Sequence, residues 1–496
     1  MHLTASLGLL LLGDWQCFGQ RLPSAAASAN LDFPTTAREY RISVFAFFRL
    51  DRESTVAPAG FNRWLVPPAA VSVHICIGQV YAFSVFNKPL SAELGVPVSQ
   101  VQWAWMSALV MLGLSAACFG KWVERSGPRR TIVCSCLLFC GGLLLTALGV
   151  SLRQLWLVLV GYGVVGGVGL GLGYIAPVST LVKWFPDRPG MAAGMAIMGF
   201  GGGALIGAPL AQELMAYFAA PGNSGAASAL VVMAVLYVCW MVFGAWIVRV
   251  PAVGWRPLTG SIPTAAGQGG SATTAAAGAA ATVAVSVDTA WRTAQFWLLW
   301  VVLCMNVSAG IGILGRAADM CQDMFGVSGA IGAGFTGVLS ISNLAGRFFW
   351  SSISDLTGRR LVYSIYFVLG AILYAVLPWT QQTQNRTLFV VLTALIISMY
   401  GGGFATIPAY LRDLFGSYQV GAIHGRLITS WSMAAVIGPM LVNGVYDRRV
   451  AAGVPKGSAY NETFYLMCGL LAVGLVANLL VRPVDRRHHV GQAEGG

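Results

Sequence analysis

A single arginine, Arg347, lies inside a long apolar stretch of the sequence. Residues 331–352 read IGAGFTGVLSISNLAGRFFWSS, and the next charged residue is Asp355. A charged side chain in the middle of a membrane costs at least roughly 2.5–3.5 kcal/mol on insertion scales, so charged residues kept there are usually functional. A guanidinium keeps its charge and can form two parallel hydrogen bonds to a carboxylate. Because no acid shares its stretch, Arg347 predicts a binding site for a small anion.

An alternative is that the Arg347 side chain extends along its helix to the membrane surface. Arg347 precedes Asp355 by eight residues, which corresponds to about 12 Å along an α-helix. A long arginine side chain can cover part of that distance and leave its charge in water. We favour the anion site and keep the surface position as the alternative.

His74 is the other residue that could carry a charge near neutral pH well inside an apolar stretch. A histidine there can relay a proton, whereas a neutral histidine can donate a hydrogen bond between helices. We favour the neutral hydrogen-bond donor and keep the proton relay as the alternative. Most of the ten cysteines also lie in apolar stretches and form no CxxC pair, so the sequence predicts neither a metal site nor a cofactor.

The elements that position these residues are membrane-spanning helices. The chain has 496 residues, of which 56% are hydrophobic and 10% charged, whereas a soluble domain has roughly 25% charged residues. Apolar stretches of about 20 residues recur, each long enough to cross a hydrocarbon core of about 30 Å. We predict an all-α polytopic membrane protein with twelve transmembrane helices, near residues 65–86, 102–120, 131–150, 155–179, 191–217, 227–249, 294–315, 329–351, 361–379, 387–410, 419–444 and 463–481.

The two halves of the chain repeat each other. Three pairs of landmarks share a common spacing to within one position: Gly127 and Gly358, Pro177 and Pro408, and Pro209 and Pro439. A segment rich in Gly, Ala, Ser and Thr within 251–286 has the composition of a flexible linker. The pattern predicts two pseudo-symmetric six-helix halves, typical of secondary transporters with a site between them. The predicted parts are an N-terminal extension (1–60), a first half (61–249), a linker (250–291), a second half (292–483) and a tail (484–496).

Positive charge is concentrated on one side of the predicted membrane. With the N-terminus inside, about 21 of the 30 Lys and Arg residues fall on the side of the termini. Basic loops favour the cytoplasmic side, so we expect a cell (plasma or inner) membrane protein with both termini cytoplasmic. The net charge of +12 therefore reflects topology and does not indicate nucleic-acid binding. The apolar segment 7–12 is too short to span and has no basic segment before it, so we expect no cleaved signal peptide and treat residues 1–60 as cytoplasmic.

Two loops of similar sequence follow the second and eighth predicted spans. Residues 120–130 read GKWVERSGPRR, and residues 355–360 read DLTGRR. The glycine in each loop permits a tight turn, and the acid can pair with arginines across the gap between the halves. We predict that the loops form a cytoplasmic gate, and the alternative is simple anchoring of basic residues on the cytoplasmic side. The predicted gate residues are Gly120, Glu124, Gly127, Arg129, Arg130, Asp355, Gly358, Arg359 and Arg360.

These loops resemble the signature loop of the major facilitator superfamily. Segments 77–86 (IGQVYAFSVF), 169–177 (GLGLGYIAP), 184–190 (WFPDRPG) and 346–350 (GRFFW) resemble the oxalate:formate antiporter branch of that superfamily. The resemblance covers about residues 62–483 and implies a twelve-helix secondary transporter. Two positions depart from the family pattern: Glu124 stands where aspartate is usual, and Ser351 replaces the leading glycine of the second loop.

The resemblance also implies roles for individual residues. Arg347 matches the arginine that binds the substrate carboxylate, and Trp431 stands where the oxalate carriers resembled here have a lysine. With one cation, a monocarboxylate is favoured over oxalate, and helix packing is the alternative role of Trp431. Asn343 stands where related proton-coupled monocarboxylate transporters have an aspartate. The resemblance also places four further residues in the cavity: Gln79, Tyr81, Tyr174 and Tyr400. Interhelical packing is the alternative role of the three tyrosines.

We therefore predict a secondary active transporter of small organic anions, monocarboxylates or dicarboxylates, that works by anion exchange through alternating access. The alternatives are a proton-coupled monocarboxylate symporter and a carboxylate sensor that transports nothing. No acid lies deep in any predicted span, which favours exchange over symport. No nucleophile–base pair or phosphate-binding loop is evident, so neither an enzyme nor an ATP-driven pump is expected. The expected partners are the carboxylate and the lipid bilayer, without nucleic acid, and the chain is expected to function as a monomer.

Overall fold

The computed structural model describes residues 49–252, 254–255 and 284–490. Within these ranges the chain forms helices, connecting segments and two isolated β-bridges, and no β-strand. The described residues from Leu50 onward belong to one compact unit. Most of the predicted N-terminal extension, the middle of the predicted linker and the end of the predicted tail lie outside the described residues.

Long helices form because an apolar stretch in a membrane must bond its own backbone polar groups, which a helix does internally. The first half of the described chain contains α3 (Val66–Ile77), η3 (Gly78–Phe86), α4 (Asn87–Leu94), α5 (Val98–Ser126), α6 (Pro128–Ser151), α7 (Leu155–Val158), η4 (Leu159–Gly166), α8 (Gly167–Trp184), α9 (Pro189–Phe218) and α10 (Ala226–Ile247). The second half contains α11 (Val287–Ala290), α12 (Ala294–Phe325), α13 (Gly329–Thr357), α14 (Arg359–Gln382), α15 (Arg386–Phe415), α16 (Val420–Leu427), α17 (Thr429–Ala451) and α18 (Asn461–Leu480).

The predicted number of transmembrane helices is confirmed. In the described ranges, eleven helical segments are long and apolar enough to cross a membrane. The twelfth long helix, α13, has 29 residues and packs against α9, α12 and α15. Its middle carries the polar residues Asn343 and Arg347, which lower its mean hydropathy. Helices α5 and α13 run six residues past the predicted ends at 120 and 351, because a helix can continue beyond the hydrocarbon layer.

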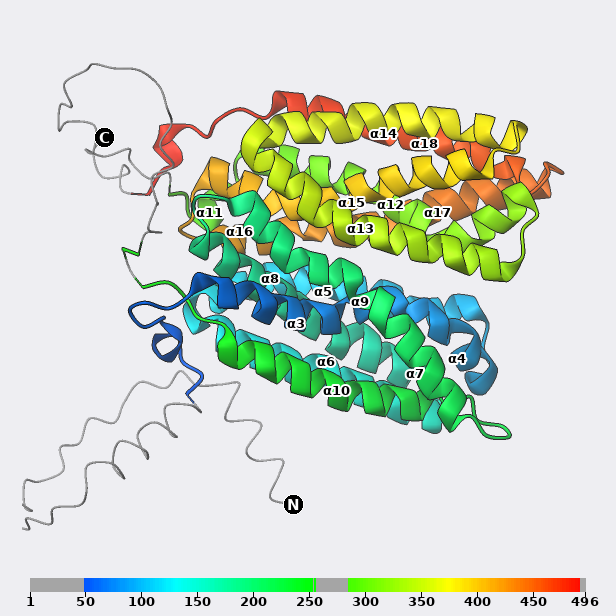
Figure 1. Cartoon of the computed structure of the whole chain (residues 1–496), viewed down its shortest axis with the longest axis horizontal. Coiled ribbons are helices and arrows are strands. Elements are labelled where there is room, and N and C mark those ends of the chain that lie inside the picture. The colour runs from blue at the N-terminus through cyan, green and yellow to red at the C-terminus, as the bar shows by residue number, and fades with distance from the viewer. Residues whose placement is uncertain (1–48, 253, 256–283, 491–496) are drawn as a thin grey trace, which may run out of the picture. The chain divides into compact units, whose positions relative to one another are not determined.

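The helices form two bundles. In the first, α10 packs against α3 and α6, and in the second, α18 packs against α12 and α14. The bundles meet where α9 packs against α13 and α15, and where α5 packs against α16 and α17. Figure 1 shows a blue-to-green bundle beside a second bundle that runs from light green to red. This arrangement agrees with the predicted fold class of two six-helix halves, whereas the exact borders of the parts stay a prediction.

Glycines at equivalent positions of the two halves let the bundles come into close contact. A Cβ at Gly194 of α9 would overlap the Ser351 hydroxyl of α13, and a Cβ at Gly425 of α16 would overlap the Ala116 carbonyl oxygen of α5. The spacing between Gly194 and Gly425 along the chain is the same as that between Gly127 and Gly358 in the paired landmarks. The repeat therefore places the same close helix approach at both crossings between the halves.

Candidate functional site

The Arg347 guanidinium is fully buried between the two bundles. Its Nε atom donates to Asn343 Oδ1 at 3.1 Å, and its Nη1 atom donates to the Ile197 carbonyl oxygen of α9 at 3.2 Å. The Nη2 atom is buried without a hydrogen-bond partner. Among the described residues, no carboxylate forms an ion pair with Arg347. Arg347 thus keeps a free donor and a positive charge that only neutral groups contact.

Two glycines make room for the Arg347 side chain. A Cβ at Gly201 of α9 would lie 2.7 Å from Arg347 Nε. A Cβ at Gly401 of α15 would lie 2.6 Å from Asn343 Oδ1 and 3.2 Å from Arg347 Cγ. Packed interiors do not tolerate such overlaps, so a larger residue at either position would displace the guanidinium or its partner Asn343.

Aromatic rings surround the guanidinium. Arg347 Cζ lies 5.8 Å from the ring centre of Phe200 and 5.2 Å from that of Phe404, which is within the range of cation–π attraction. Six rings form what we call the aromatic cage: Tyr81, Tyr174, Phe200, Tyr400, Phe404 and Trp431. They come from five elements, η3, α8, α9, α15 and α17, so both bundles contribute.

The cage joins the two bundles by direct contacts. The hydroxyl groups of Tyr81 and Tyr400 share a hydrogen bond of 3.1 Å. The Trp431 ring centre lies 5.4 Å from that of Phe200 and 4.6 Å from that of Phe404. Tertiary packing therefore brings rings from distant parts of the sequence into one enclosure beside Arg347.

Several polar atoms in and beside the cage are buried and have no partner. They include Arg347 Nη2, Tyr174 Oη and Trp431 Nε1, each on a side chain at most 1% exposed. His424 of α16, whose ring centre lies 5.9 Å from that of Tyr174, adds an unpartnered Nε2 atom. Buried polar atoms without partners are uncommon in folded proteins, and each needs an explanation. Three of these four atoms are hydrogen-bond donors, so the cage suits a ligand that accepts hydrogen bonds and carries negative charge.

The structure brings together most of the residues that the sequence predicted for the site. Around Arg347 lie Asn343, Tyr81, Tyr174, Tyr400 and Trp431. Gln79 lies apart from them: it is fully buried, and its Oε1 atom accepts a hydrogen bond of 3.2 Å from Tyr162 within the first bundle. The sequence did not indicate Phe200, Phe404 or His424. The repeat could have indicated Phe200, since it occupies the position of the first half that is equivalent to Trp431.

His74 is held between two backbone carbonyl groups. Its Nδ1 atom lies 2.5 Å from the Ala196 carbonyl oxygen of α9, and its Nε2 atom lies 3.1 Å from the Tyr174 carbonyl oxygen of α8. A neutral imidazole has one N–H group and can donate to only one of these carbonyls. The predicted interhelical contact of His74 is therefore present in the structure, while the alternative of a proton relay stays a prediction.

Each acid of the two similar loops contacts the helix start of the opposite half. We call the end of the bundles that carries residues 120–130 and 355–360 the motif end. Glu124 of α5 accepts hydrogen bonds from Lys183 and, at 3.0 Å, from the Gly421 amide in the first turn of α16. Asp355 of α13 accepts from the Gly190 and Met191 amides in the first turn of α9, both at 2.8 Å. A carboxylate at a helix N-terminus satisfies free amides and favours the helix dipole.

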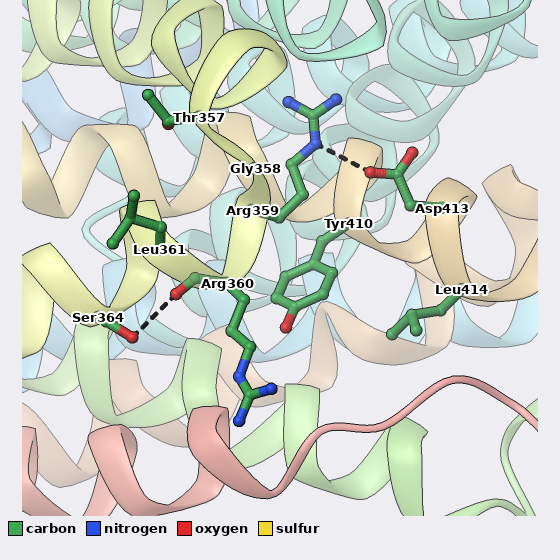
Figure 2. Close-up of a pocket in the computed structure, with 9 residues that line it drawn as sticks. All are labelled: Thr357, Gly358, Arg359, Arg360, Leu361, Ser364, Tyr410, Asp413 and Leu414. Carbon is green, nitrogen blue, oxygen red and sulfur yellow. Dashed lines mark hydrogen bonds and ion pairs between the residues drawn. The ribbon is translucent and has the colours of Figure 1, made fainter.

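This pairing differs from the expected one between acids and arginines across the gap. Arg359 instead pairs with Asp355 of its own half at 2.5 Å and with Asp413 at 3.1 Å. Figure 2 shows that Arg359 and Arg360 point in opposite directions, with Arg359 directed toward Asp413, beside a groove of about 560 Å³. Free amides at a helix start can donate to a carboxylate without a charged partner, and Arg359 pairs with acids of its own half instead.

The other gate residues have structural contacts within or between the bundles. Arg129 donates to the Ala245 carbonyl at the end of α10, and Arg360 donates to the Leu479 carbonyl at the end of α18. The Arg130 guanidinium lies 6.0 Å from the Trp122 ring centre. The turns after α5 and α13 use Gly127 and Gly358, whose φ angles are +83° and +91°. A Cβ at Gly120 would lie 2.9 Å from Ala422 Cα, so this glycine lets α5 approach α16.

A further ionic contact at the motif end was not predicted from the sequence. Asp288 of α11 accepts from Lys121 of α5 at 2.5 Å and from Arg426 of α16 at 2.8 Å. Arg426 also donates to the Val287 carbonyl oxygen at 2.9 Å. The hydrogen bonds from Lys121 and Arg426 lower the pKa of the Asp288 carboxyl from its usual value. The end of the linker thus touches both halves.

Polar contacts between the described parts of the two halves lie at the level of the cage or toward the motif end. Besides those already given, Ser432 donates to the Leu109 and Val110 carbonyls, and Arg412 donates to the Pro186 carbonyl. At the opposite end, no hydrogen bond or ion pair between residues 49–255 and 284–490 is present. In this structure, hydrogen bonds and ion pairs therefore connect the two halves at the motif end and not at the opposite end of the described residues.

Comparison with known families gives one clear match. The sequence description of the Major Facilitator Superfamily matches residues 69–343 and 322–496. An uncharacterized MFS-type transporter of Escherichia coli (strain K12), YhjX, is 27% identical over 76% of this chain and 86% of its own length. The oxalate:formate antiporter of Oxalobacter formigenes is 23% identical over 76% and 83%. The apicoplast pyruvate carrier 1 of Toxoplasma gondii is 25% identical over 84% and 80%.

Solved structures share the same fold. The proton:xylose symporter XylE superposes with a TM-score of 0.62 at 14% identity, covering 85% of this chain and 96% of that one. The transporter FucP in its outward conformation superposes with a TM-score of 0.60 at 13% identity, covering 85% and 100%. At these identities the likeness concerns the fold alone.

Proposed function

Because this chain belongs to the Major Facilitator Superfamily and is a membrane transporter rather than an enzyme, we propose that it exchanges small organic carboxylates across its membrane by alternating access. The observation that carries this proposal is the fully buried Arg347 guanidinium, which has neutral partners and a free Nη2 atom. A buried cation without a counter-charge is costly, and a carboxylate supplies both the charge and the acceptor atoms.

The surroundings of Arg347 support a small substrate. The Phe200 and Phe404 rings contact the guanidinium, with ring centres 5.8 and 5.2 Å from Arg347 Cζ, so this tightly packed cage suits only a compact substrate. Two relatives carry names that state such cargo, an oxalate:formate antiporter and a pyruvate carrier. These cargoes are carboxylates of few atoms, in agreement with the chemistry around Arg347.

A monocarboxylate is the favoured class. Arg347 is the sole fixed cation among the described residues that contact the cage, and Trp431 adds a neutral ring at the position where a second cation would be needed for a dianion. One guanidinium balances one carboxylate. A dicarboxylate would bring a second buried negative charge without a fixed partner, at a considerable cost.

The buried charge of Arg347 also favours anion exchange over transport in one direction. When the carrier returns empty, Arg347 must pass through a closed state without a counter-charge, in contact with uncharged groups such as Asn343 and the Ile197 carbonyl. Moving an uncompensated charge through a closed membrane protein is unfavourable, whereas a bound carboxylate neutralises it. Return with a substrate is therefore faster than return without one.

The motif-end contacts act as the gate in this scheme. We place the motif end in the cytoplasm because its loops hold Arg129, Arg130, Arg359 and Arg360. The contacts of Glu124 and Asp355 with the opposite helix starts close that side. The structure then corresponds to a carrier that is closed on the cytoplasmic side with Arg347 fully buried, and breaking both contacts permits the inward-facing state.

Reconstituted vesicles test the proposal. Vesicles loaded with unlabelled pyruvate should take up labelled pyruvate faster than empty vesicles, because the loaded carrier returns with its charge balanced. Arg347→Gln should lose this uptake, whereas Arg448→Gln, which changes an exposed arginine, should keep it. Normal uptake by Arg347→Gln would refute the role of Arg347, and equal rates in loaded and empty vesicles would refute obligatory exchange.

A further inference from the structure

One side of the aromatic cage is polar and forms no hydrogen bond with Arg347, which donates to Asn343 and Ile197. His424 of α16 and Trp431 of α17 are seven residues apart, which places them on one face of the eleventh span. The Tyr174 ring of α8 packs against both, with ring centres at 5.9 and 5.7 Å. Each of the three side chains is at most 1% exposed.

Two rings stand between these residues and Arg347. Phe200 lies 5.8 Å from the guanidinium carbon and 5.4 Å from the Trp431 ring. Phe404 lies 5.2 Å from the same carbon and 4.6 Å from the Trp431 ring. The cage therefore has an arginine end and a second end formed by Tyr174, His424 and Trp431, with the two phenyl rings in contact with both.

The second end has hydrogen-bonding atoms that the protein leaves unused. Tyr174 Oη, His424 Nε2 and Trp431 Nε1 are all buried without a partner. Leaving a buried polar atom unpaired costs more than the net gain of making its bond. These three atoms lie on neighbouring side chains from both bundles, and a single acceptor atom of a ligand would give all three a partner.

We propose that Tyr174, His424 and Trp431 form a second subsite, which binds an oxygen atom of the substrate other than those of the carboxylate at Arg347. The indole N–H and the phenol O–H donate to that oxygen, and the His424 tautomer with a proton on Nε2 adds a third donor. The carrier consequently selects short carboxylates that bear a second oxygen function over carboxylates with a plain alkyl tail. This inference rests on the proposed carboxylate site at Arg347.

The position of His424 links this subsite to the gate. Gly421, one turn earlier on α16, donates its amide to Glu124 at the motif end. A substrate oxygen that binds His424 therefore contacts the helix whose first turn the gate acid holds. An alkyl tail would leave the three polar atoms unpaired in the closed site, and the preference for an oxygen is strongest there.

Matched acids test the subsite on the purified carrier. Pyruvate and propionate have the same chain length and charge and differ in the 2-oxo group. By isothermal titration calorimetry, wild-type protein should bind pyruvate at least about tenfold more tightly than propionate. Equal affinities would overturn the second subsite, and this comparison requires no variant that has to fold.

Variants then assign the selectivity to residues. Trp431→Phe and His424→Phe remove the polar atoms and keep an aromatic ring, so each should weaken pyruvate binding about tenfold and reduce the preference for pyruvate over propionate. Trp379→Phe changes a lipid-facing indole that is 52% exposed and should alter neither. If both cage variants keep the wild-type selectivity, the subsite assignment is wrong.

The two proposals fail in different ways. Arg347→Gln should weaken pyruvate and propionate binding by the same factor, because both acids present a carboxylate to the arginine. If wild-type protein binds neither acid, or if Arg347→Gln binds both normally, the proposed carboxylate site is refuted, and the second subsite with it. If Arg347→Gln weakens both acids while pyruvate and propionate bind equally to the wild type, only the second subsite is refuted.

Discussion

Phe200 and Trp431 occupy equivalent positions of the two halves and meet at the centre of the protein. They have the same spacing along the chain as Gly127 and Gly358, and their ring centres lie 5.4 Å apart at an interplanar angle of 75°. The same spacing relates Glu124 to Asp355, which cap helices of opposite halves. One repeat thus underlies both the central cage and the contacts at the motif end.

Removing a gate acid should loosen the helix start that it caps. Asp355→Ala deletes the hydrogen bonds to the Gly190 and Met191 amides. Loss of a helix cap costs about 0.5–2 kcal/mol, so exchange of these amides should accelerate by roughly 2- to 30-fold. Hydrogen-exchange mass spectrometry of the first turn of α9 measures this rate. Thr357→Ala, an exposed site two residues away, is the control, and unchanged protection in Asp355→Ala would contradict the capping role.

The equivalent change in the other half should affect the other helix. Glu124→Ala removes the acceptor of the Gly421 amide, so the first turn of α16 should lose protection while that of α9 keeps it. The reason is that each acid contacts a different helix start. If Glu124→Ala instead lowered the hydrogen-exchange protection of α9 and left that of α16 unchanged, the assignment of Glu124 to α16 and Asp355 to α9 would be wrong.

Filling the space beside the guanidinium should weaken substrate binding. In Gly201→Ala, the new Cβ would lie 2.7 Å from Arg347 Nε and force the side chain aside. Overpacking of this kind costs about 1–3 kcal/mol, which predicts a roughly 5- to 150-fold weaker affinity for pyruvate. Gly141→Ala, where nothing lies within 4 Å of the added atom, should bind pyruvate as the wild type does. Normal affinity in Gly201→Ala would show that the guanidinium position is not needed.

The ion pairs of Asp288 with Lys121 and Arg426 should stabilise the protein less at acidic pH. Because Lys121 and Arg426 lower the pKa of Asp288 below the usual 3.8, the ionised form is favoured in the folded protein. Its stabilising contribution is complete above the unfolded-state pKa and is lost as the pH falls through the lower folded-state pKa. The difference in melting temperature between wild type and Asp288→Asn should be constant near neutral pH, shrink below about pH 3.8 and shrink with added salt. A difference that grows in acid would contradict this assignment.

Replacement of His74 should lower the stability of the protein without changing the dependence of pyruvate uptake on the pH gradient. His74→Leu removes the hydrogen bond that the neutral ring donates to one of the Ala196 and Tyr174 carbonyls, which should destabilise the protein by about 1–3 kcal/mol. Under exchange, collapsing the pH gradient with an ionophore should leave pyruvate uptake unchanged in wild type and variant alike. Uptake that depends on the gradient in wild type and loses this dependence in His74→Leu would establish the proton-coupled alternative.

Local features of the sequence account for the helices, the repeat and the position of Arg347. Each membrane span needs only a stretch of apolar residues, since a helix bonds its own backbone inside the bilayer. The two similar loops identify the repeat because a tight turn and a basic loop are also local properties. For this reason the twelve helices and the family could be predicted without any tertiary contact.

The partners of those residues depend on which helix faces meet, and the sequence alone does not contain that information. Packing directs Gln79 toward Tyr162 rather than Arg347, and it brings His424 to Tyr174 from the opposite half. It also gives the gate acids backbone amides rather than arginines as partners across the halves. The sequence by itself determined a membrane carrier with one buried cation. Only the tertiary structure decided what surrounds that cation, because contacts between helices depend on faces that lie far apart along the chain.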